Sequence, residues 1–148
     1  MHGAGAGYIE KIIGEGIGCI EAIRTAPDPL FGGVNPEPIP KNMAAPLEYI
    51  KRKNFDLGVA IDGDADRIGA MRSDGRYITS GQIISMILLH FLEDKGLRGT
   101  VVKTISGTTL IERICERFNL KLFETPVGFK NIASLMLKED ILIGGEES

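Results

Sequence analysis

The chain has 148 residues, enough for one ordinary domain or two small ones. Its apolar content of 43% and charged content of 25% are typical of a soluble globular protein. The formal charge of −3 and the scattered Lys and Arg residues lack the clustered positive charge of a nucleic-acid binder, so no nucleic-acid partner is expected.

The sequence predicts no membrane or secretory segment. The longest strongly apolar stretch, Ile83 to Leu92, is too short to span a bilayer. The N-terminus has no basic region followed by an apolar one. Cys19 and Cys115 lie in apolar runs outside any C-x-x-C pair, which predicts buried, reduced thiols. We therefore expect a cytoplasmic protein without a membrane partner.

The first half of the chain is predicted to end in a β-hairpin. Prolines within residues 26–42 exclude a regular helix or a central strand, so this stretch is expected to be a long ordered loop. The other expected elements are a helix over 8–14, a strand over 17–23, a helix over 46–53, a strand over 56–61 and a hairpin of 68–72 and 76–78.

The second half is predicted to form a parallel or mixed sheet with helices on its faces. Ser80 is expected to cap a helix that runs to Lys95 and is closed by Gly96. Because this helix is apolar on nearly every side, it is expected to be the most buried one. Strands are then expected over 100–105, 120–124 and 141–143, alternating with helices over 108–118 and 129–138.

Both ends of the chain are expected to be incomplete. The glycine-rich opening has no strand before it, although glycine-rich ligand loops of α/β proteins follow a strand. The last residues, 144–148, come directly after a predicted strand with no helix to complete the unit. The predicted fold class is therefore α/β, with two mixed-sheet domains, 1–78 and 79–148, each lacking a part.

The strongest chemical signal is the segment D-G-D-A-D-R at residues 62–67. It places Asp62, Asp64 and Asp66 at alternate positions after an apolar strand, in a loop of the kind where α/β proteins bind ligands. Three such carboxylates repel one another and need a cation, and hard oxygen ligands suit Mg²⁺ or Ca²⁺. Gly63 permits the sharp turn that brings the side chains together.

Two other interpretations of this segment are weaker. An EF-hand loop needs Gly at its sixth position and Glu at its twelfth, where this chain has Arg67 and Ser73. A solvated acidic turn is possible for any such cluster, but this one follows an apolar strand and ends in Arg, a good phosphate partner. The glycine-rich opening has Tyr8 where a dinucleotide loop needs its third Gly, so a tight structural turn is preferred there.

In this context D-G-D-A-D-R resembles the metal-binding loop of the α-D-phosphohexomutases, the phosphoglucomutase/phosphomannomutase family. Four other segments agree in order. Residues 1–8 resemble the loop after the first strand of the family's second domain, and residues 31–38 resemble its F-x-G-x-x-P-x-P segment. Residues 126–130 resemble the V-G-x-K turn of the third domain, and residues 145–148 match its sugar-binding loop G-E-x-S. The resemblance covers essentially the whole chain.

The resemblance implies a four-domain enzyme that interconverts hexose 1-phosphate and 6-phosphate through a phosphoserine and a bisphosphorylated sugar. G-E-E-S is more similar to the glucose/mannose branch than to the glucosamine branch. The sequence contains no T-A-S-H-N-P-like serine loop and no R-x-S-G-T-E-P-like phosphate loop. Domains one and four are therefore expected to be missing partners, and the isolated chain is expected to be inactive and to bind metal weakly.

Site residues follow from the same resemblance. It implies Mg²⁺ as the cofactor, held by Asp62, Asp64 and Asp66, and it implies that Arg67 steadies the transferred phosphoryl group. The residues expected to bind the hexose phosphate are Glu146, Ser148, Lys103, Gly128 and Lys130. A polar turn at 145–148 and a solvated lysine at the strand end remain the alternatives that composition alone suggests.

Two other function classes remain open. The chain could be a non-catalytic metal-binding or structural module. It could also be a phosphate hydrolase with an aspartate nucleophile, but such enzymes show D-x-D-x-[TV] and this chain has Asp66 at the last of these positions.

Overall fold

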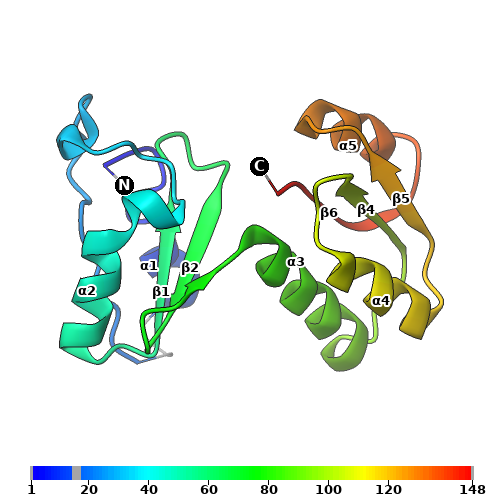
Figure 1. The fold of residues 1–148 in the computed structure, drawn as a ribbon, viewed down its shortest axis with the longest axis horizontal. Coiled ribbons are helices and arrows are strands. Elements are labelled where there is room, and N and C mark those ends of the chain that lie inside the picture. Colours follow the sequence, from blue (N-terminus) through cyan, green and yellow to red (C-terminus); the bar gives the residue numbers. More distant parts are fainter. Residues whose placement is uncertain (1, 15–17, 148) are drawn as a thin grey trace. The chain divides into compact units, whose positions relative to one another are not determined.

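The computed structural model describes residues 2–14 and 18–147, and the chain divides into two compact units, Met1–Ile78 and Thr79–Ser148. Each unit combines helices with a small sheet of its own, so the predicted α/β class is confirmed (Figure 1). Within the described residues, no helix is long and apolar enough to cross a membrane.

The sheet of the first unit is antiparallel, with strand order β1-β2-β3. Its strands are β1 (Leu57–Ile61), β2 (Ile68–Arg72) and β3 (Tyr77–Ile78). Residues 62–67 connect β1 to β2, and a tight turn with Gly75 at φ 79° leads into β3. This positive φ favours glycine because a side chain there would be strained. The predicted strand and hairpin are confirmed to within a residue.

Two helices and two short turns complete the first unit. They are α1 (Tyr8–Ile13), η2 (Phe31–Gly33), η3 (Pro40–Asn42) and α2 (Ala44–Lys53). Both predicted helices are confirmed, with α2 starting two residues earlier than expected. Ile50 of α2 packs so closely on Gly58 of β1 that a Cβ at Gly58 would overlap it. The main buried cluster of this unit consists of Met43, Ile50, Ala60 and Met71.

The strand predicted over residues 17–23 is wrong for residues 18–23, and residue 17 lies outside the described part. Gly18 has φ 96°, which is not a strand conformation. The segment is mostly exposed, and Cys19 is exposed with it, so the predicted burial of this thiol is also wrong. The apolar residues of this segment predicted a strand, but a strand also needs a neighbour that accepts its backbone hydrogen bonds.

The second unit has a parallel sheet with strand order β5-β4-β6. Its strands are β4 (Thr100–Thr104), β5 (Leu122–Thr125) and β6 (Ile141–Gly145), and its helices are α3 (Ser80–Leu89), η4 (His90–Asp94), α4 (Thr109–Phe118) and α5 (Phe129–Met136). Helices α3 and α4 lie on one side of the sheet and α5 on the other (Figure 1). The predicted parallel arrangement with helices on both faces is confirmed.

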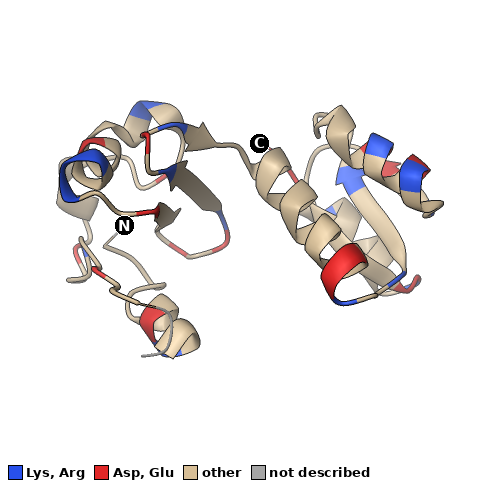
Figure 2. Ribbon diagram, turned by 90° about the horizontal axis from the view of Figure 1, so that it is seen from below, with Lys and Arg blue, Asp and Glu red and all other residues tan. Residues whose placement is uncertain are grey.

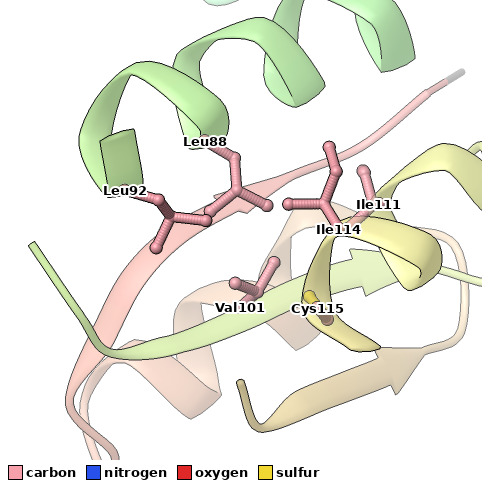
Figure 3. Close-up of a cluster of buried hydrophobic side chains, with 6 residues drawn as sticks. All are labelled: Leu88, Leu92, Val101, Ile111, Ile114 and Cys115. Carbon is pink, nitrogen blue, oxygen red and sulfur yellow. The ribbon is translucent and has the colours of Figure 1, made fainter. Parts of the chain in front are cut away.

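The core of the second unit lies between this sheet and the helices α3 and α4. Figure 3 shows side chains from η4, α3, β4 and α4 pointing toward one another. The buried members are Leu88, Leu92, Val101, Ile111, Ile114 and Cys115. Val102, the neighbour of Val101 along β4, faces α5 instead, where it approaches Gly144. The predicted burial of the Cys115 thiol is confirmed.

Two details of helix α3 differ from the prediction. Its N-cap is Thr79 and not Ser80: the Thr79 hydroxyl accepts from the Gln82 N–H, and the Gln82 side chain accepts from the Thr79 N–H. Helix α3 contains no charged residue, and the first charged residues after it lie in η4 (Figure 2). Even so, α3 is not buried on all sides. Met86 and Ile87 are 52% and 40% exposed, because the sheet and α4 cover only part of it.

Candidate functional site

The acidic loop of the first unit brings its three aspartates together. The loop is closed by the backbone N–H of Asp62, which donates to the carbonyl of Arg67 (3.2 Å). One carboxylate oxygen from each of Asp62, Asp64 and Asp66 lies within 4.8 Å of the others. Asp62 is buried, whereas Asp64 and Asp66 are exposed. Ala65 between them has φ 68°, the left-handed conformation that turns the loop back on itself.

Asp62 is the fixed member of this cluster. Its Oδ1 accepts from the backbone N–H groups of Asp66 (3.0 Å) and Arg67 (3.1 Å), and its Oδ2 accepts from Arg67 Nε (2.8 Å). Burial works to raise the pKa of Asp62, but these hydrogen bonds from Arg67 outweigh burial and hold the pKa below its usual value. Asp62 is therefore an ionised carboxylate in a defined position.

The pKa of Asp66 is shifted in the opposite direction, above its usual value. A side-chain hydrogen bond to the Asp62 carboxylate is the main cause that raises the pKa of Asp66, followed by desolvation and then the charges of Asp64 and Asp62. Like charges at this distance disfavour the ionised form. The loop thus concentrates more negative charge than it compensates, which is the electrostatic condition for holding a cation.

Arg67 is held from two sides. Besides its bond to Asp62, its Nη1 donates to Glu37 Oε1 (2.6 Å), and its Nε lies 3.7 Å from Asp66. The hydrogen bond to Asp62 is the main cause that raises the pKa of Arg67 above its already high value. Its side chain remains 45% exposed. A guanidinium anchored in this way can present its remaining N–H groups to a phosphate.

Two segments far away in the sequence contact the loop at Gly63. The backbone N–H of Ala4 donates to the carbonyl of Gly63 (2.9 Å), and a Cβ at Gly3 would overlap that carbonyl. The Phe31 ring packs on Gly63, where a Cβ would lie 2.9 Å from it. Close approach of the Gly63 carbonyl therefore requires glycine at position 3, and a side chain at position 63 would displace the Phe31 ring.

In the second unit, residues at the carboxyl ends of the three strands meet. The backbone N–H of Gly128, after β5, donates to Glu146 Oε1 (3.1 Å), after β6. Ser106, after β4, donates its hydroxyl to the carbonyl of Glu147 (2.8 Å). This edge of a parallel α/β sheet is where such folds bind ligands. The structure thus brings together Gly128 and Glu146, two of the residues predicted to bind the sugar phosphate.

The other residues predicted for this site are placed differently. Lys103 is buried, and its ammonium contacts Glu112 (2.6 Å), Glu124 (3.5 Å) and the carbonyl of Gly107 (3.3 Å). Burial works to lower the pKa of Lys103, but Glu112 in particular outweighs it and the pKa is raised. Lys130 is exposed near the start of α5. Ser148 lies outside the described residues.

Sequence reasoning missed two residues that the structure places at these loops, Glu37 and Ser106. Glu37 lies in the 31–38 segment, whose prolines and glycines carry the family resemblance. No sequence pattern links Glu37 to Arg67, which is 30 positions away. Ser106 had no signal, because its partner Glu147 is 41 positions away. Contacts of this kind arise only from the fold.

The acidic loop fits a divalent cation. Its three carboxylates offer hard oxygen donors that converge within 4.8 Å, and one of them is already fixed by three hydrogen bonds. Mg²⁺ favours such oxygen ligands and fills its remaining positions with water or phosphate oxygens. The residues that could hold it are Asp62, Asp64 and Asp66.

Comparison with known families accounts for nearly the whole chain. The model described as phosphoglucomutase/phosphomannomutase, alpha/beta/alpha domain II, matches residues 1–75, and the model for domain III of the same family matches residues 79–148. The chain belongs to the phosphoglucomutase/phosphomannomutase family. The resemblance found in the sequence is thereby confirmed.

Individual members of the family agree with this assignment. The chain is 33% identical to a phosphoglucomutase/phosphomannomutase of Thermococcus kodakarensis over 99% of its length and 28% identical to Phosphoglucomutase-1 of Homo sapiens over all of it. A crystal structure from Thermus thermophilus, described as a phosphomannomutase, matches with a TM-score of 0.90 and 42% identity over 99% of the chain. The chain spans about a third of the length of these proteins, namely 32%, 27% and 34%.

Proposed function

We propose that this chain supplies the metal loop and part of the sugar site of an enzyme that interconverts hexose 1-phosphate and hexose 6-phosphate, with glucose or mannose as the sugar. In this proposal a phosphoserine supplied by another domain exchanges its phosphoryl group with a bisphosphorylated sugar. Membership of the phosphoglucomutase/phosphomannomutase family supports the reaction class. The observation that carries the proposal is the convergence of three aspartates beside an anchored arginine.

Each residue of the acidic loop has a distinct role in this proposal. Asp62, Asp64 and Asp66 hold Mg²⁺, which when bound offsets negative charge on the transferred phosphoryl group. Asp62 is prealigned by its hydrogen bonds, so little reorganisation is needed for it to act as a ligand. Arg67 directs its free N–H groups to the phosphoryl oxygens, as guanidinium groups do in phosphoryl transfer.

The loop after β6 binds the sugar in this proposal. Glu146 is oriented by the N–H of Gly128 on one oxygen, which leaves the other to accept from a sugar hydroxyl. Lys130, exposed near the N-terminus of α5, is suited to an anionic group of the substrate. Ser148, two residues further along the sequence, supplies a hydroxyl to the sugar in this proposal. Lys103 contributes through the fold of the site, because its ammonium is engaged by Glu112 and Glu124.

The test uses the 148-residue chain with glucose 1,6-bisphosphate as the probe. We expect the bisphosphate to shift the amide NMR signals of Gly128 and Glu146, and the Glu146→Ala variant to lose this response. Glu116→Ala, on the exposed side of α4, is the matched control and should behave like the wild type. No shift in the wild-type chain would contradict the sugar site.

The same chain should show no turnover of glucose 1-phosphate in a coupled assay and only weak Mg²⁺ binding by calorimetry. Its sequence contains no serine loop of the phosphoryl-donor type, and water must replace the phosphoserine oxygen as a ligand. Turnover above background, or micromolar affinity for Mg²⁺, would contradict this part of the proposal.

A further inference from the structure

The segment around Glu37 is held rigidly by contacts that do not involve its side chain. The Glu37 N–H donates to Asn35 Oδ1 (3.0 Å), and its carbonyl accepts from Asn42 Nδ2 (2.9 Å). The flanking prolines, Pro36 and Pro38, restrict the backbone further. The position of the Glu37 carboxylate is therefore set by a preformed loop.

This loop is also fixed against the sheet. Pro38 is buried, and its carbonyl accepts from the Tyr77 hydroxyl (2.7 Å). On β2, a Cβ at Gly69 would lie only 2.6 Å from the same carbonyl, so the loop packs directly on the strand that follows the acidic loop. The Glu37 carboxylate thus faces Arg67 from a support that is independent of the aspartates.

The two anchors of Arg67 differ in what a cation does to them. Asp62 bonds Arg67 through Nε, but Asp62 also belongs to the acidic cluster, so a bound cation draws on the same carboxylate charge. Glu37 bonds Arg67 through Nη1 and is not one of the three clustered aspartates. Only the Glu37 anchor therefore keeps its full charge when the cluster is engaged.

We propose that Glu37 is a positioning residue that holds the Arg67 guanidinium beside the acidic loop when the aspartates bind a cation. The inference rests on the proposed function for the role of Arg67, but the pairing itself is a property of the chain without metal. Glu37 acts through Arg67 and does not contact the cation. Its loss should loosen Arg67 while leaving the loop around it folded.

The test measures solvent exchange of the Arg67 Nε–H by NMR in the ¹⁵N-labelled 148-residue chain, with the signal assigned from the Arg67→Lys variant. In Glu37→Ala we expect exchange to be roughly two- to fivefold faster than in the wild type, the range for losing a partly exposed ion pair. Glu37→Gln should fall between the two, because a neutral amide still accepts. With MgCl₂ present the difference should widen, because Asp62 then holds Arg67 less strongly.

Glu48→Ala is the control, since it removes an equal charge from an exposed position on α2 in the same unit. It should leave Arg67 exchange unchanged. Backbone amide spectra report whether each variant is folded. Wild-type exchange in a folded Glu37→Ala chain, with or without MgCl₂, would overturn the inference.

The design separates this inference from the proposed function. If MgCl₂ shifts no amide signal of residues 62–67 in the wild-type chain, the metal site is wrong, whereas faster exchange in metal-free Glu37→Ala still supports the anchor. If MgCl₂ shifts those signals but Glu37→Ala does not change Arg67 exchange, the metal site stands and the positioning role is wrong.

Discussion

At the scale of single residues, Asp62 and Asp66 of the acidic loop have pKa values shifted in opposite directions, downward for Asp62 and upward for Asp66. A carboxylate with a raised pKa in the folded state costs stability at pH values above that pKa. We therefore expect Asp66→Asn to raise the free energy of unfolding of the metal-free chain at neutral pH. The gain should disappear as the pH falls below the usual pKa of aspartate, about 3.9, and urea denaturation across this range measures it.

The same substitution should weaken Mg²⁺ binding by roughly an order of magnitude, because one of the three carboxylates proposed as ligands is lost. Asp56→Asn, an exposed aspartate just before β1, controls for the change in net charge. If the metal-free Asp66→Asn chain is less stable than the wild type, the ionised Asp66 carboxylate is not destabilised by its neighbours.

The residues of this loop could be predicted from the sequence because they are contiguous. Residues Asp62 to Arg67 are neighbours in the sequence and directly follow a predicted strand. Their proximity in space therefore requires only that the turn closes, which the Asp62 N–H to Arg67 carbonyl hydrogen bond does. The supporting contacts could not be predicted in the same way. Gly3, Phe31 and Glu37 reach the loop from other parts of the chain, and no local periodicity encodes such approaches.

At the scale of elements, the N-terminus of α3 depends on Thr79. Thr and Ser are both favoured at N-cap positions, so the sequence alone does not decide whether Thr79 or Ser80 caps the helix. The structure places the reciprocal hydrogen bonds on Thr79 and Gln82. We expect Thr79→Ala to lower the free energy of unfolding by about 0.5–2 kcal/mol, as the loss of an N-cap does. Urea denaturation followed by circular dichroism measures the change.

Ser80→Ala provides the matched control, because it removes the same kind of hydroxyl one residue later and should have little effect. A larger loss from Ser80→Ala than from Thr79→Ala would restore the cap predicted from the sequence.

The burial of helix α3 also differs from what its sequence pattern predicted. Apolar residues all round α3 predicted complete burial, yet burial also requires neighbours on every side, and Met86 and Ile87 are left exposed.

At the scale of the whole molecule, the two units differ in the size of their buried apolar clusters. The second unit buries six side chains in one cluster between its sheet and two helices (Figure 3). The first unit has a smaller core of four. On the face of β1 opposite α2, Leu57 is 57% and Val59 is 40% exposed, beside a cavity of about 480 Å³. Apolar surface left in contact with water contributes nothing to folding.

We therefore expect residues 79–148, expressed alone, to unfold cooperatively in urea, and residues 1–78 alone to be markedly less stable. Domains of this size are marginal, so a modest difference in buried apolar surface decides whether one folds. Circular dichroism of the two pieces and of the 148-residue chain provides the comparison. Leu57→Ser should change the stability of the first piece little, because that side chain is already exposed, whereas Ile50→Ala should abolish its folding. A first piece that is as stable as the second would show that its exposed apolar face carries no energetic cost.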